Sequence, residues 1–145
     1  MTQEDKELLL KDLCARLPYG IQVLADLDKE FDDGIVGVLV RIESYVGKRY
    51  PELKGQYLLY QQGCLTPLVV DEVKPYLRPM SSMTEEEINE FILISDTVLW
   101  LGDKKSTCIL SLEQKDWLNA HHFDYRGLIE KGLAIKVTEE NNPYE

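Results

Sequence analysis

The chain has 145 residues and a net charge of −10, with 44% hydrophobic and 29% charged side chains. This length and composition are typical of one globular domain and exclude a disordered or low-complexity chain. The longest apolar runs fall far short of the roughly 18 to 20 residues of a membrane-spanning helix, so we expect no membrane segment. Residues 81–145 carry 6 basic and 13 acidic side chains, and this half should repel nucleic acid.

The first predicted element is a helix that begins at Thr2, because a threonine followed by acidic residues is typical of a helix N-terminus. Pro18 should end this helix. Apolar residues recur with the spacing i, i+3, i+4, i+7, which predicts one core-facing stripe. The stripe consists of Leu10, Leu13, Cys14 and Leu17.

The opening residues also bear on location. Charged side chains stand where a secretory signal would have a basic patch and an unbroken apolar run, so we expect a cytoplasmic protein. The three cysteines, Cys14, Cys64 and Cys108, lie far apart and lack the spacing of zinc or redox sites. We interpret them as reduced and mostly buried structural residues.

Strand-like patterns follow the first helix. Residues Ile21–Ala25 alternate in polarity, and Ile35–Ile42 is rich in β-branched residues, so both are predicted strands. Asp32, Asp33 and Gly34 tolerate the positive φ of a tight turn, which predicts a β-hairpin.

The middle of the chain is predicted as loop and strand in turn. Tyr45–Gly55 reads as a loop, and Gln56–Gln61 and Leu65–Val70 read as the third and fourth strands. Pro67 should place the fourth strand at an edge of the sheet. Lys74–Pro79 is predicted as a turn or an extended segment.

A complete capping box over Thr84–Glu87, with Met83 and Ile88 placed as a hydrophobic staple, predicts the start of a second helix. That helix should bury Ile88, Phe91 and Ile92.

Residues Val98–Leu101 and Thr107–Leu112 are predicted to form a second hairpin. Another capping box, Ser111–Gln114, should start a helix. Its shared side carries Trp117, Leu118 and His121. Asp124–Ile129 should form a turn or short helix and Gly132–Val137 a last strand, followed by a frayed tail.

These elements predict one α+β domain covering residues 1–145. We expect an N-terminal helix, a small antiparallel sheet, a capped helix, a β-hairpin and a C-terminal helix. An alternative is that the strands between Gly20 and Arg78 curl into a small open barrel of the SH3-like kind.

Catalytic signatures are missing from the sequence: it contains no nucleophile elbow, phosphate-binding loop, dinucleotide turn or zinc-protease helix. His121 and His122 are the only histidines, and adjacent side chains on a helix diverge by about 100°, so we expect neither a metal site nor a catalytic pair. His121 could be a packed ring hydrogen-bonded to Asp124. We expect no cofactor and lean against an enzyme.

One stretch departs from the acidic character of the chain. Residues 41–54 have four basic and two acidic side chains, and tyrosines, including Tyr60 just beyond, are interleaved with them. Cations that meet phosphates and rings that stack on bases are what single-stranded nucleic-acid binding needs, but tyrosines are equally common at protein interfaces. The candidate binding face consists of Arg41, Tyr45, Lys48, Arg49, Tyr50, Lys54 and Tyr57.

Three segments, Leu8–Gly20, Val73–Glu86 and Phe123–Ile129, resemble a family of short uncharacterised proteins from gut anaerobic bacteria and their phages or mobile elements. The resemblance implies a cytoplasmic bacterial or phage-related setting, and it implies no activity. Residues Val23–Asp71 match least well, which would suit a variable recognition face.

The leading hypothesis is therefore a non-enzymatic domain that binds another protein through its strand region and tyrosine-rich loop. The alternative is a small-barrel protein that binds RNA or single-stranded DNA through the candidate binding face.

Overall fold

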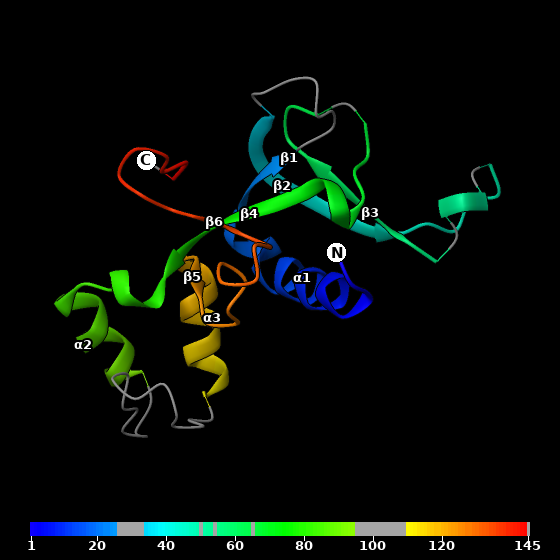
Figure 1. The fold of residues 1–145 in the computed structure, drawn as a ribbon. Coiled ribbons are helices and arrows are strands. Elements are labelled where there is room, and N and C mark those ends of the chain that lie inside the picture. Colours follow the sequence, from blue (N-terminus) through cyan, green and yellow to red (C-terminus); the bar gives the residue numbers. More distant parts are fainter. Residues whose placement is uncertain (26–33, 50, 54, 65, 95–109, 145) are drawn as a thin grey trace.

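A mixed sheet and three helices make up the computed structural model, which describes residues 1–25, 34–49, 51–53, 55–64, 66–94 and 110–144 (Figure 1). The helices are α1 (Gln3–Arg16), α2 (Glu85–Leu93) and α3 (Leu112–Ala120). The strands are β1 (Gln22–Ala25), β2 (Ile35–Ser44), β3 (Tyr57–Gln61), β4 (Val73–Pro79), β5 (Phe123–Asp124) and β6 (Ile135–Lys136).

The strand order is β3-β2-β1-β4-β5, and β6 also pairs with β4. Pairs β1–β2, β1–β4 and β2–β3 are antiparallel, whereas β5 and β6 run parallel to β4. The predicted α+β class is confirmed. The sheet is mixed instead of purely antiparallel, and no pairing between described strands closes it into a barrel.

Two predicted segments differ in their roles from the simplest expectation. Lys74–Pro79, predicted as a turn or an extended segment, is extended and lies in β4, whose residues Tyr76 and Leu77 are buried. Its prolines argue against a strand locally, but β1 pairs with its first half, and β5 and β6, which come from much later in the chain, pair with its second half. In the predicted fourth strand, Leu68 alone forms a bridge, to Leu59, and Val70–Glu72 is a short 3₁₀ helix.

Helix α1 begins and ends as predicted, with Thr2 as its N-cap and Arg16 as its last residue. Its core-facing stripe differs from the prediction. Leu9 and Leu13 are fully buried, whereas Cys14 is exposed. The buried stripe of α1 consists of Leu9, Asp12, Leu13 and Arg16, so two of its four residues are charged.

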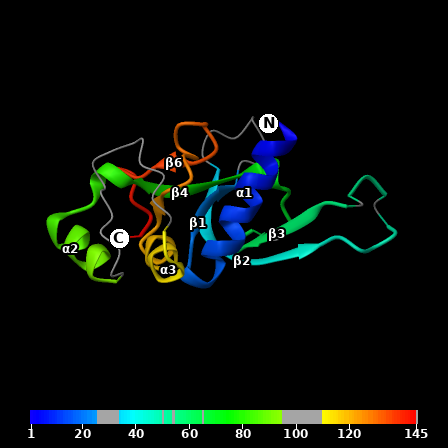
Figure 2. The same ribbon diagram turned by 90° about the horizontal axis from the view of Figure 1, so that it is seen from below.

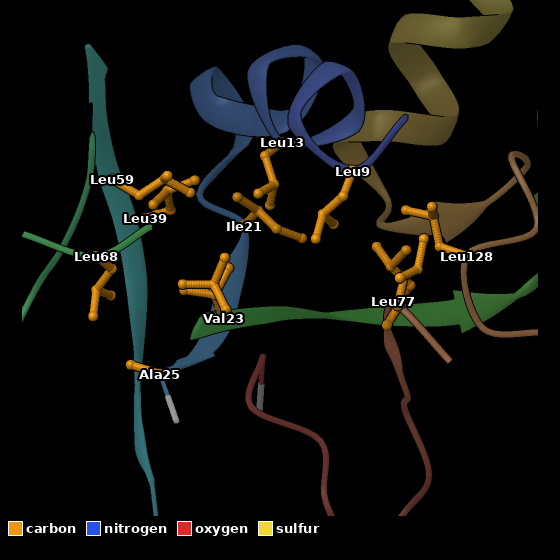
Figure 3. Packing of buried hydrophobic residues seen from close by; sticks show 13 residues of the cluster. Leu9, Leu13, Ile21, Val23, Ala25, Leu39, Leu59, Leu68, Leu77 and Leu128 are labelled. Atoms are coloured by element: carbon orange, nitrogen blue, oxygen red, sulfur yellow. The ribbon is translucent and has the colours of Figure 1, made fainter. Parts of the chain in front are cut away.

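The main core lies between α1 and the sheet (Figure 3). Leu9 and Leu13 of α1 point toward Ile21 and Val23, and Leu77 of β4 packs in the same cluster. Each fully buried side chain of this kind stabilises the fold by about 1.5–3 kcal/mol relative to an exposed one.

A second cluster joins α2, α3 and β5. The Trp117 ring lies 5.5 Å from Phe91 and 5.8 Å from Phe123 between ring centroids. Met83 and Ile88, the predicted hydrophobic staple, both pack there, whereas Ile92 is 37% exposed. This second cluster therefore holds α2 and α3 together at the end of β4.

Both predicted capping boxes are confirmed. At α2, the Thr84 side chain accepts from the Glu87 amide at 3.2 Å, and Glu87 accepts from the Thr84 amide at 3.0 Å. Arg78 holds the Glu87 carboxylate with two hydrogen bonds, of 2.9 and 2.8 Å, and lowers its pKa to about 2.

Replacing Thr84 with alanine should lower the free energy of unfolding by about 1 kcal/mol, because the Glu87 amide loses its cap. Urea denaturation followed by circular dichroism measures this change. The exposed neighbour Ser81 provides the control, and Ser81→Ala should shift the free energy by less than about 0.5 kcal/mol. Equal effects of the two substitutions would argue against the cap.

The remaining predictions concern connections. Asp32 and Asp33 of the first turn, and most of the second hairpin, lie outside the described residues, while Leu112 of that hairpin begins α3. The last strand, β6, is shorter than predicted. The tail is anchored: Tyr144 donates to the Tyr76 carbonyl at 2.8 Å and accepts from the Gln22 amide at 3.2 Å.

Candidate interaction site on the β2–β3 arm

The distal part of the β2–β3 hairpin, residues 40–60, projects away from the helices and from the rest of the sheet (Figures 1 and 2). We call this part the arm. It forms because β2 is ten residues long and changes partner along its length. Residues 35–38 pair with β1, whereas residues 39–44 pair with β3. Beyond Leu39 the hairpin no longer pairs with β1; Leu58 and Leu59 are still buried at the base of the arm, and its outer part projects.

Contacts with backbone carbonyls hold the base of the arm in place. The side-chain amide of Gln61, which is only 3% exposed, donates to the carbonyls of Val23 and Ile35 at 2.8 and 2.7 Å. At Gly37 a Cβ atom would collide with the Gln62 carbonyl, so glycine is required. The β2–β3 register shifts between Leu39 and Arg41, and such a bulge bends the strand.

Arg41, the first residue of the predicted face, stacks on a residue that the prediction left out. Its guanidinium lies 4.0 Å from the centroid of the Tyr60 ring, and its Nε lies 3.7 Å from Glu43. The Tyr60 hydroxyl donates to Glu43 at 2.7 Å, and this hydrogen bond raises the pKa of Tyr60. Tyr60 belongs to this face because it is the cross-strand register partner of Arg41, and the sequence alone does not show that register.

Three more predicted residues, Tyr45, Lys48 and Arg49, follow the end of β2 toward the tip of the arm. The Tyr45 amide donates to the Gln56 carbonyl at 2.9 Å, and its ring lies close enough to Gly47 that an added Cβ would be 2.8 Å from the hydroxyl oxygen. Lys48 and Arg49 are exposed. Tyr50 and Lys54 lie outside the described residues.

Tyr57 lies on the opposite side of the arm from Arg41. It pairs with Ser44, three residues beyond Arg41 on β2, and successive side chains of a strand point to opposite faces. The predicted face is therefore not one surface. Arg41 and Tyr60 occupy one face of the arm, and Tyr57, which is 44% exposed, occupies the other.

Tyr57 borders a cleft of about 790 Å³ between the arm, the start of α1 and the 3₁₀ helix Val70–Glu72. The cleft has four carboxylate side chains in its lining: Glu7, Glu52, Asp71 and Glu72. Lys6, also in the lining, forms an ion pair with Asp71 at 3.0 Å. The cleft is therefore acidic, whereas the tip of the arm is basic.

His121 and His122 lie in different surroundings, as expected because the side chains of adjacent residues diverge. The His121 ring stacks on Trp117 with centroids 4.0 Å apart, and the His122 ring stacks on Tyr144 at 3.9 Å. The expected bond from His121 to Asp124 is wrong. Nδ1 of His121 instead contacts the Trp117 carbonyl at 2.8 Å, while Asp124 accepts from two backbone amides of the following turn.

The described residues include no cluster of metal ligands, and the Cys14 thiol is not activated. No group of three histidine, cysteine or acidic side chains there could hold a metal ion. Cys14 is a free thiol, and the residue is exposed, contrary to the prediction. Its Sγ atom still loses some contact with water, which raises the pKa of the thiol and disfavours the reactive thiolate. Cys64 is also free and is half-buried, and Cys108 lies outside the described residues.

No protein-family model, curated protein or solved structure matches this chain. In the part of the chain that the structure describes, every helix is too short or too polar to cross a bilayer. What the chain does must therefore be inferred from the arm and the cleft themselves.

Proposed function

We propose that this chain is a non-enzymatic protein-interaction domain of the cytoplasm, and that the arm is its contact surface. The observation that carries the proposal is the combination of shape and charge. Residues 41–54 carry a charge of +2 in the sequence, and those of them that the structure describes lie on the arm, while all other residues together carry −12. A projecting surface of opposite sign to the body can select a partner that the body repels.

Exposed apolar side chains on the arm support the same proposal. Val40 is 56% exposed and Val46 is 89% exposed, although both belong to the β-branched residues that usually pack in sheets. A partner that covers them would remove apolar surface from water. Their position next to Arg41 and Lys48 gives the mixed apolar and cationic character of a protein interface.

Single-stranded nucleic acid is the alternative partner, and the contacts on the arm support it less well. Arg41 lies over the Tyr60 ring and near Glu43, so the cation and the ring already interact with each other and with a carboxylate.

The test is affinity capture from host lysate with the tagged full chain, with and without nuclease. The double variant Lys48→Glu/Arg49→Glu should reduce capture of a nuclease-resistant partner protein at least tenfold, because it reverses the charge of the tip. The matched control is Lys115→Glu/Lys131→Glu, which makes the same charge change at two exposed sites away from the arm and should capture as the wild type does.

Equal capture by the wild type and the arm variant would refute the proposal. Enrichment of nucleic acid, with the proteins lost on nuclease treatment, would favour the alternative partner.

A further inference from the structure

We infer that the arm binds its partner by strand addition: an extended, acidic segment of another protein pairs with the free edge of the arm, from Ile42 of β2 to Val46 just beyond the end of β2. This inference rests on the proposed function and names the chemistry of the partner. Three observations support it, namely the direction of the backbone groups, the point at which β1 ends its pairing, and the charge of the arm.

The backbone groups of Ile42 and Ser44 point away from β3. The Tyr45 amide donates to the Gln56 carbonyl, so the peptide groups of Tyr45 face β3. Since successive residues of a strand face opposite edges, those of Ser44 and Ile42 face the other edge.

Strand β3 gives an independent check of this direction. Leu59 is the register partner of Ile42, yet it exchanges both of its backbone hydrogen bonds, each 2.8 Å long, with Leu68. The pair Ile42 and Leu59 is therefore a non-hydrogen-bonded pair of the β2–β3 ladder. Ile42 is left with its N–H and C=O directed at the open edge.

Strand β1 does not reach this edge. Its pairing with β2 ends at Gln22 and Val38, followed by one bond from the Leu39 amide to the Ile21 carbonyl. Within the described ranges, no strand pairs with β2 on that side beyond Leu39; the 3₁₀ helix Leu17–Tyr19 lies against β2 there and does not form a ladder with it. Natural proteins usually protect such edges with proline or by short length, whereas residues 42–46, Ile-Glu-Ser-Tyr-Val, contain no proline and favour strand.

Charge identifies the occupant as acidic. Lys48 and Arg49 follow the edge and are exposed, whereas Arg41, which precedes it, already lies near Glu43. An acidic segment is attracted there and repelled by the remaining residues with their charge of −12. A second copy of this chain is a poorer occupant, because edge-to-edge pairing would bring two arms of +2 together. Strand addition also provides the affinity through main-chain hydrogen bonds, and side chains on alternate positions provide the specificity.

The test is amide NMR of the full chain titrated with a short synthetic peptide that alternates valine with glutamate. In the free chain, the amides of Glu43 and Tyr45 should exchange slowly and those of Ile42 and Ser44 quickly. On peptide addition, the amides of Ile42, Ser44 and Val46 should shift and become protected. A peptide with lysine in place of glutamate should bind at least tenfold more weakly.

Ser44→Pro is the decisive variant, because it removes an N–H that points to the open edge and leaves the β2–β3 hydrogen bonds in place. It should weaken peptide binding at least tenfold, whereas Ser44→Ala should bind within twofold of the wild type. Unshifted amides at about 1 mM peptide, where even a weak complex is populated, would overturn the inference. So would equal binding by the two Ser44 variants.

Other outcomes separate this inference from the proposed function. Protection of Ile42 and Ser44 without peptide, together with a doubled molar mass in light scattering, would make a second copy the occupant and overturn the acidic segment. If Ser44→Pro still captures the lysate partner that Lys48→Glu/Arg49→Glu loses, strand addition fails and the interaction function stands. If both variants capture it fully, both proposals fail.

Discussion

Replacing Asp12 with asparagine should lower the free energy of unfolding by about 3–5 kcal/mol, because it leaves buried cations without their counter-charge. The Asp12 carboxylate is fully buried and accepts from Nε of Arg16 at 2.8 Å and from Nε of Arg126 at 3.1 Å. Arg16 is also fully buried. It donates through Nη2 to the Phe123 carbonyl at 2.6 Å, and none of the described residues accepts a hydrogen bond from its Nη1.

Urea denaturation at neutral pH measures this loss. The control is Asp71→Asn, which breaks the ion pair with Lys6 between side chains that are 48% and 39% exposed, and should cost less than about 1 kcal/mol. A double variant, Asp12→Leu/Arg16→Met, should recover much of the loss, because no buried charge then remains on α1. An Asp12 effect as small as that of Asp71 would contradict the account.

The second large effect is a loss of stability on mild acidification that depends on His122. Burial, together with the nearby charges of Arg16, His121 and Arg78, lowers the pKa of His122 to about 4, whereas the unfolded chain has the ordinary value near 6.5. Between these values the unfolded state binds the additional proton. Stability from this group is therefore fully present above pH 6.5 and is lost as the pH falls to about 4.

The size of this loss is at most about 3 kcal/mol, and less where water screens the half-buried ring. Urea denaturation at pH 7 and pH 4.5 measures it. His122 has a left-handed backbone, with φ of 62°, which asparagine tolerates, so His122→Asn is a suitable control that cannot titrate. The variant should lose most of the pH dependence between 6.5 and 4.5. An unchanged pH dependence would place the titrating group elsewhere.

Local signals predict the boundaries of this fold well. The capping boxes at Thr84 and Ser111 and the end of the first helix before Pro18 depend only on neighbouring residues, and all three are confirmed. The predicted stripe of α1 was correct for Leu13 and wrong for Cys14, and it missed the buried charges for the opposite reason. Asp12 is buried because it binds Arg126, more than a hundred residues away, and hydrophobic periodicity counts only apolar side chains.

Strand β4 shows the same limit. Its two prolines favour a turn, and its pairing with β1 upstream and with Phe123 and Ile135 downstream makes it a strand. A pattern read over a short window cannot contain partners that lie about fifty residues downstream.

For the candidate site, composition located the arm and could not resolve its surfaces. Interleaved cations and tyrosines indicated residues 41–57, but the separation of Arg41 from Tyr57 follows from the cross-strand register. The open edge at Ile42 depends on where β1 ends its pairing and on the bulge after Leu39. Neither feature has a local sequence signal.

The strand partners of β4 also constrain the order of folding during synthesis. β1 is made before β4, whereas β5 and β6 and the anchoring Tyr144 follow it. A nascent chain that has reached only α3 has no partner for the Tyr76–Pro79 part of β4, and the Arg16 side chain still lacks the Phe123 carbonyl. Final packing of the N-terminal helix must therefore wait for the last quarter of the chain, and contacts of such long sequence separation form slowly.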